Sequence, residues 1–339
     1  MLRSMYSGIS AMKNFQTKLD VIGNNIANVN TYGFKKGRTI FQDLISQTIS
    51  GASAPSQGRG GTNPRQVGLG SQLAAIDTIH TTGSTQPTGR VLDLAISGDG
   101  FFQVANSNDP TLPFSTQPLF TRAGNFYLDK NGYLVTSDGY YVVGFAAYAT
   151  GNYDPDGAAG AIPPINNVTL SPMPSDITPN NFNFTTNPPT YTGGTASISN
   201  PAGASFSAAN ANVQYKPIKI PTDAQTISVG QDGSITYVDR FGTLRWAGQL
   251  VLAKFPNNGG LEKAGANLYR ETPNSGTPIL NFAGAAGIGA IQSGALEMSN
   301  VDLAEEFTEM IVAQRGFQAN TRIITTSDEI LQELVNLKK

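Results

Sequence analysis

Paired carboxylates are the first chemistry that this sequence could support, because two aspartates across a sugar ring can hydrolyse a glycosidic bond. Each candidate directly precedes a glycine: Asp99, Asp138, Asp156 and Asp232. Asp-Gly is a preferred dipeptide of tight turns, since Asp bonds to nearby backbone and Gly accepts a positive φ. Turn geometry therefore explains these residues, and we predict no glycosidase site.

Metal-dependent and nucleophilic chemistry have few residues to draw on. The chain has no cysteine and a single histidine, His80, in a strand-like run. A zinc site would need carboxylates for its other ligands, and a serine triad would rest on His80 alone. Residues 129–132 lack the oxygen ligands of a calcium loop, and residues 287–292 lack the last glycine of a dinucleotide-binding turn. We expect no enzyme activity, no metal and no cofactor.

Charge is sparse in the 339 residues. Charged residues make up 14% of the chain and the net charge is −2, against roughly a quarter charged residues in average proteins. A weakly charged surface suits self-association and offers no basic stripe for nucleic acid. A secreted β-rich enzyme or adhesin fits this composition equally well. No apolar run is long enough for membrane insertion, and polar residues near the N-terminus argue against a cleaved signal peptide.

Two terminal segments have helical periodicity, with apolar residues three and four apart. The N-terminal stripe is Leu2, Met5, Ile9, Met12, Gln16, Leu19, Gly23 and Ile26, widened by Phe15, Ile22 and Val29. The C-terminal stripe is Leu303, Phe307, Met310, Gln314, Phe317, Thr321, Ile324, Asp328, Leu331 and Val335. Ser299 and Asp302 resemble a capping box that starts the second helix, expected over 300–338. The stripes can pair within one chain, and their polar interruptions favour packing between copies as well.

The middle of the chain predicts β-structure, since Asp-Gly and Asn-Gly dipeptides separate short apolar runs. We expect a multidomain protein of mixed α and β class, with a coiled-coil inner domain from residues 1–30 and 300–339. A Gly- and Pro-rich extended connection is expected over 31–72, with little regular structure in 46–72. All-β middle and outer domains are expected from 73–145 with 218–299, and from an insert at 146–217.

Both ends also carry specific motifs. LDVIGNNIAN at 19–28 and YGFK at 32–35 resemble the N-terminal signature of flagellar rod and hook proteins, and they contain Asn24, Asn25, Asn28, Gly33 and Phe34. LEMSNVDL at 296–303 and QRGFQAN at 314–320 resemble the C-terminal signature, with Ser299, Asn300, Arg315 and Gly316. Within this family the start and the connection at 48–70 look most like hook members from Gram-positive bacteria. Distal rod members are the alternative.

The resemblance implies a structural role. Terminal helices would line an inner tube of identical subunits, the connection would bridge neighbours, and the β domains would form outer layers. Expected partners are further copies of the chain, the rod, the hook cap and the hook–filament junction proteins. Export would use the flagellar type III apparatus and place the chain outside the cell, in a flexible coupling that passes torque from rod to filament.

Overall fold

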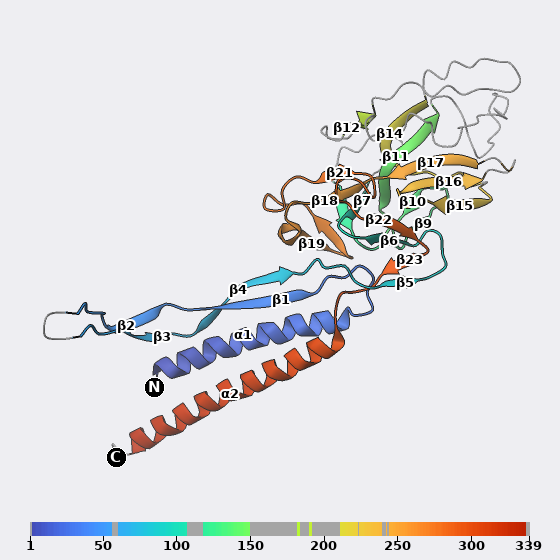
Figure 1. The fold of residues 1–339 in the computed structure, drawn as a ribbon. Helices are drawn as coiled ribbons and strands as arrows, with labels where there is room; N and C mark the ends of the chain where they lie inside the picture. The colour runs from blue at the N-terminus through green and yellow to red at the C-terminus, as the bar shows by residue number, and fades with distance from the viewer. Residues whose placement is uncertain are drawn as a thin grey trace, which may run out of the picture. The chain divides into compact units, whose positions relative to one another are not determined.

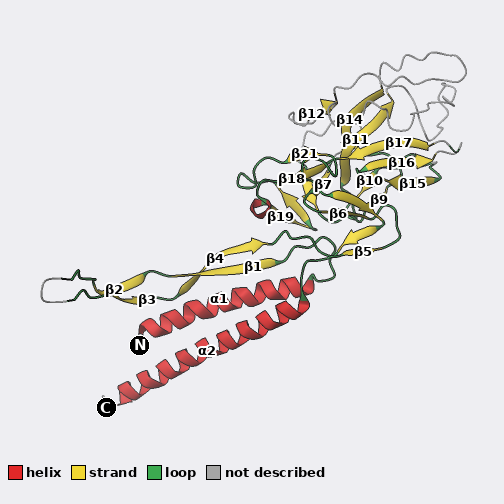
Figure 2. Ribbon diagram, viewed as in Figure 1, coloured by secondary structure: helices red, strands yellow, loops and turns green. Residues whose placement is uncertain are grey.

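The computed structural model describes residues 2–55, 60–106, 118–149, 182–183, 190–191, 211–222, 224–238, 242 and 244–336. The chain divides into two compact units. The first comprises Met1–Asn30, Lys35–Thr81 and Asn300–Lys339; the second comprises Thr31–Phe34 and Thr82–Ser299. Figure 2 shows both long helices in the first unit and strands through the second, which confirms the predicted class.

The first unit is a helix pair with a long β-ribbon. Its elements are α1 (Leu2–Ala27), β1 (Gly37–Asp43), β2 (Ser46–Ser50), β3 (Arg65–Gly68), β4 (Ser71–Thr78) and α2 (Leu303–Asn336). Figure 1 shows α1 and α2 side by side, with both chain ends at the same end of the pair. Neither helix has an apolar stretch long enough to span a membrane.

Helix α2 begins three residues later than expected because Asp302, not Ser299, is its cap. The Asp302 carboxylate accepts hydrogen bonds from the backbone N–H groups of Ala304, at 2.8 Å, and Glu305, at 3.4 Å. This satisfies two of the amide groups that a helix start leaves without intrahelical partners.

The described part of 46–72, predicted as a long extended connection, contributes strands to the ribbon. Strand β1 pairs antiparallel with β4, and β2 pairs antiparallel with β3. Each pair contains a bulge, between Ile40 and Phe41 and between Thr48 and Ser50. Strand β4 therefore belongs with the helices rather than with the β domain predicted to start at residue 73. It also ends at Thr78, two residues before His80.

The second unit contains one large antiparallel sheet and three separate strand pairs, β6 with β22, β5 with β23 and β12 with β13. The strands of the unit are β5 (Thr85–Pro87), β6 (Leu94–Ser97), β7 (Phe101–Ala105), β8 (Leu119–Thr121), β9 (Tyr127–Leu128), β10 (Leu134–Val135), β11 (Tyr141–Ala149), β12 (Phe182–Asn183), β13 (Thr190–Tyr191), β14 (Ala211–Pro217), β15 (Thr226–Val229), β16 (Ser234–Val238), β17 (Leu244–Leu250), β18 (Leu252–Lys254), β19 (Glu262–Gly265), β20 (Leu268–Arg270), β21 (Ile279–Asn281), β22 (Ala290–Ser293) and β23 (Ala295–Glu297). The main path is β15-β16-β17-β11-β7-β8-β20-β19.

Tight turns lie at the predicted Asp-Gly positions of this unit. Gly100, Gly139 and Gly233 all have positive φ, so the aspartates before them lie in turns, where glycine is the favoured next residue. Asp156 lies outside the described residues. The core contains fully buried side chains from several strands, among them Phe102 and Leu250.

The large sheet extends into the predicted insert at 146–217. Strand β11 continues to Ala149 and pairs with β14 from Ala149↔Ala211 to Val143↔Pro217. Both ends of the predicted insert are therefore part of the sheet. Residues 150–181, 184–189 and 192–210 lie outside the described residues.

Candidate self-assembly surface

The two helices pack antiparallel through small residues. A Cβ added at Gly8 would lie 3.4 Å from Ile324, and one added at Gly316 would lie 2.5 Å from the ring of Phe15. Ala313, three residues before Gly316 on α2, is fully buried. Small residues at these positions let the helix backbones approach closely. The family-motif residue Gly316 is therefore a close-packing position.

The side of α2 that packs against α1, its seam, is rotated about the helix axis from the predicted apolar stripe. Its buried positions include Glu306, Ala313 and Ser327. The predicted residues Met310, Phe317, Ile324 and Leu331 are half-buried, whereas Leu303, Phe307 and Val335 are exposed. On α1, Ile22 is buried and Met5, Ile9, Met12, Leu19 and Ile26 are half-buried; the Leu2 side chain lies outside the description. The predicted stripe therefore contains the half-buried residues of the seam but not its buried members Glu306, Ala313 and Ser327, which are small or polar and give no hydrophobic signal.

Large aliphatic and aromatic side chains remain exposed on two other sides of α2. Leu303, Phe307 and Ile311 lie four residues apart on one side, with Phe307 50% and Ile311 58% exposed. Val312, Ile323 and Ile330 share another side, since their spacings of eleven and seven complete whole helical turns. Exposed apolar rows of this kind mark a surface that packs against another molecule.

The ribbon covers α1 along one half and projects uncovered along the other. Phe41 of β1 lies beside Phe15 of α1, with ring centroids 6.4 Å apart, and Asn14 donates a hydrogen bond to Ser71. By contrast, all residues of β2 and β3 are exposed. Ile45 and Ile49 in this half are 82% and 66% exposed.

Two family-motif asparagines form hydrogen bonds with the base of the ribbon, where β1 begins and β4 ends. The Asn25 side chain both donates to the carbonyl of Gly37, at 2.9 Å, and accepts from its N–H, at 3.0 Å. The Asn300 side chain accepts from the N–H of Lys36 and donates to the carbonyl of Ile79, each at 2.8 Å. Each amide thus imitates the pairing of a β-strand, which fixes where β1 begins.

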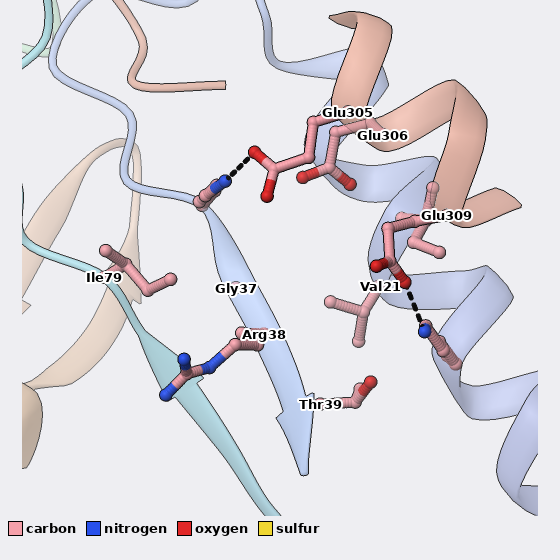
Figure 3. Close-up of a pocket in the computed structure, with 11 residues that line it drawn as sticks. Val21, Gly37, Arg38, Thr39, Ile79, Glu305, Glu306 and Glu309 are labelled. Atoms are coloured by element: carbon pink, nitrogen blue, oxygen red, sulfur yellow. Dashed lines mark hydrogen bonds and ion pairs between the residues drawn. The ribbon is translucent and has the colours of Figure 1, made fainter. Parts of the chain in front are cut away.

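A cavity of about 270 Å³ adjoins this base (Figure 3). Glu305, Glu306 and Glu309 of α2 line it together with Lys18 of α1 and Lys36 before β1. Glu305 pairs with Lys36 at 2.6 Å, and Glu309 pairs directly with Lys18. The pKa of Glu306 is raised, chiefly because burial disfavours the ionised carboxylate. A hydrogen bond from Asn25 and the charge of Lys36 act in the opposite direction, and the carboxylates of Glu305 and Glu309 raise the pKa further.

Gly33 and Phe34 belong to the second unit. Gly33 has φ +70°, and a Cβ there would lie 2.7 Å from the backbone nitrogen of Ala123, so the position requires glycine. The Gly33 N–H donates to the carbonyl of Glu297 at 2.8 Å. Phe34 is buried, and the ammonium of Lys263 lies 5.0 Å from its ring centre.

Glu297, whose carbonyl accepts from Gly33, also forms a buried ion pair with Arg122. Arg122 Nε lies 2.5 Å from a carboxylate oxygen of Glu297, and both side chains are at most 5% exposed. Arg122 also donates to the carbonyls of Ile96, Gly98 and Gly100. The second Glu297 oxygen accepts from the N–H of Gly83. Sequence analysis missed this pair because 175 residues separate its members.

Of the remaining motif residues, Asn24 and Arg315 are exposed, Asn28 is half-buried and Ser299 is buried. Asn28 donates to the carbonyl of Asn24 at the end of α1. Arg315 is exposed and donates to Gln318 at 3.4 Å. Ser299 is buried in the second unit. Among the described residues, no three or more His, Asp or Glu side chains form a group that could hold a metal ion.

Three family models match the chain. Residues 5–35 match the flagella basal body rod protein model, 95–237 the flagellar hook protein FlgE/F/G D1 domain, and 292–337 the flagellar basal body rod FlgEFG protein C-terminal model. The flagellar basal-body rod protein FlgG of Bacillus subtilis is 51% identical, and the flagellar hook protein FlgE and rod protein FlgG of Borreliella burgdorferi are 37% and 33% identical. Each of these three alignments covers all of both chains.

Proposed function

The chain belongs to the family of flagellar rod and hook proteins, and we propose that it polymerises into the hollow tube of the flagellar hook. As a family member it is a structural component of the flagellum, in the rod or hook. The finer assignment to the hook, the place of the chain outside the cell and its export through the type III apparatus are parts of the proposal. So is the absence of enzyme activity.

A comparison within one organism favours the hook. Borreliella burgdorferi has both proteins, and this chain is 37% identical to its hook protein but 33% identical to its rod protein. The distal rod is the second candidate, because the 51% identical relative in Bacillus subtilis is named a rod protein.

The exposed apolar sides of α2 carry the assembly proposal. Phe307, Ile311 and Val312 are at least half exposed in the single chain, and such a helix gains most by packing on several neighbours. The predicted packing set on both terminal helices then divides into two groups. Half-buried members such as Met310 and Phe317 pack within a subunit, and exposed members such as Phe307 pack between subunits.

Electron microscopy of the purified chain under polymerising conditions tests this function. Curved hollow tubes support the hook, and straight tubes support the distal rod. Complete failure to polymerise would contradict both. Ile311→Gln is expected to block tubes without changing the folded subunit, while Lys13→Gln, at an exposed position of α1, serves as the control.

A further inference from the structure

One carboxylate in the cavity beside the ribbon base is left without a cation of its own. Three glutamates line this cavity, and Lys36 and Lys18 pair with Glu305 and Glu309. Arg38 also lines it but pairs with Asp77 at 3.5 Å. Figure 3 shows Glu306 between the other two glutamates. When the Arg38–Asp77 pair is counted as neutral, the other charged residues of the cavity, three glutamates and two lysines, leave one negative charge without a cation.

Glu306 is also poorly hydrated. Its residue is 6% exposed, and the neutral amide of Asn25 donates to it at 3.1 Å. Because burial disfavours the ionised form, the folded pKa is raised. A raised folded pKa means that ionisation at neutral pH destabilises the folded unit, and this loss disappears as the pH falls below that pKa. A cation entering the cavity would remove the same loss.

The walls of the cavity suit a long basic side chain. Val21, Ile22 and Ile79 supply aliphatic surface beside the carboxylates. Arginine and lysine pack an aliphatic stem on such surface while the charged head group reaches a polar partner. Arginine fits a buried carboxylate best, because its planar guanidinium can donate two parallel hydrogen bonds and is weakly hydrated.

Two arginines of α2 present suitable head groups. Arg315 and Arg322 are exposed, and in the described part of the chain neither forms an ion pair. They are seven residues apart, so they share one side of the helix. By helical spacing this side lies between the two exposed apolar rows that contain Ile311 and Val312.

We propose that this cavity receives the guanidinium of Arg315 or Arg322 from a second copy of the chain, which pairs with Glu306. This pairing rests on the proposed self-assembly and names one of its contacts. It makes assembly depend on an ionised Glu306, so that acid weakens the tube at this contact even though it favours the folded single chain.

Assembly measurements on the full chain test the pairing. Glu306→Gln keeps an acceptor for Asn25 but removes the charge, and we expect it to raise the critical concentration for tube formation about tenfold, as for a desolvated ion pair. Arg315→Gln or Arg322→Gln, whichever is the partner, should raise it equally, and combining it with Glu306→Gln should add little. Glu262→Gln, at an exposed position of β19 outside this cavity, is the control and should change it less than about threefold.

The dependence on pH provides an independent readout. The wild-type critical concentration should rise as the pH falls through the raised pKa of Glu306, and Glu306→Gln should lose that part of the dependence. Normal tubes from Glu306→Gln, or additive effects with both arginine variants, would overturn the pairing while leaving the proposed function intact. Failure of the wild-type chain to polymerise would overturn both.

Discussion

Gly316→Ala is the sharpest test of how α1 and α2 pack. A Cβ at this position would lie 2.5 Å from Cζ of Phe15, far inside a normal carbon–carbon contact. Phe15 has limited room to withdraw, because the ring of Phe41 lies on the ribbon beside it, 6.4 Å away between centroids. Gly23 in α1 is the matched control, since an added Cβ there meets nothing within 4 Å.

The expected magnitudes follow from two opposing effects. Replacing glycine by alanine in a helix interior favours the helix by about 1 kcal/mol, whereas overpacking a close contact costs about 1–3 kcal/mol. Gly23→Ala should therefore stabilise the first unit by about 1 kcal/mol. Gly316→Ala should destabilise it by about 0–2 kcal/mol. The two variants should differ by about 1–3 kcal/mol, or roughly 4–12 °C in melting temperature for a unit of this size.

Far-UV circular dichroism during thermal unfolding measures this difference, first on the dilute chain and then on assembled tubes. Phe15→Leu combined with Gly316→Ala should recover part of the loss, because the smaller side chain makes room for the methyl group. Equal shifts for the two alanine variants, or no recovery with Phe15→Leu, would refute the proposed close packing.

Three other variants test the motif residues and the sheet. Asn300→Ala should speed amide exchange at Lys36, whose N–H loses its acceptor, whereas Asn24→Ala should not; equal exchange rates in both would contradict the role of this hydrogen bond. Arg122→Met should lower the free energy of unfolding of the second unit by about 3–5 kcal/mol in urea, because the buried Glu297 loses its charged partner. Adding Glu297→Gln should restore most of that stability. A loss that this second change does not restore would point to packing instead. Replacing 150–210 by Asn-Gly should keep the subunit folded and able to form tubes, because Ala149 pairs with Ala211. Deleting 146–217 removes β14 and should unfold the sheet. Loss of folding in both variants would disprove a separable insert.

Local signals made much of the fold predictable. The stripes at both ends predicted the helices to within a few residues, because amphipathic periodicity reflects burial of one helix face. Asp-Gly dipeptides located the turns of the sheet, since a positive φ is a property of the glycine itself. The strands of the ribbon were missed because every residue of β2 and β3 is exposed in the single chain. Their polar, Gly-rich sequence therefore looks like a loop.

The contacts of the motif residues were beyond the reach of local patterns. Asn25 and Asn300 were identified as motif residues, yet their partners Gly37, Lys36 and Ile79 are fixed only when the ribbon folds back on the helices. The buried Glu306 was missed because a glutamate in the first turns of a helix is normally explained by the helix dipole.

The arrangement of α2 suggests why its sequence departs from an ordinary coiled coil. The positions of α2 that are buried against α1, Glu306, Ala313 and Ser327, are small or polar. Larger seam residues such as Met310 and Phe317 are only half-buried, and Phe307 and Ile311 point into solvent. An apolar side chain contributes about 1.5–3 kcal/mol when fully buried, so most of the apolar burial available to α2 is deferred until neighbours cover it. Helix α2 also has 34 residues against 26 in α1, and pairing Gly8 with Ile324 leaves its last turns beyond the start of α1. Because the contact between α1 and α2 buries little apolar surface and the outer sides of α2 offer more, the helix pair becomes fully ordered only on assembly. Adjacent subunits then meet through apolar surfaces that can shift against one another, because hydrophobic contact is non-directional.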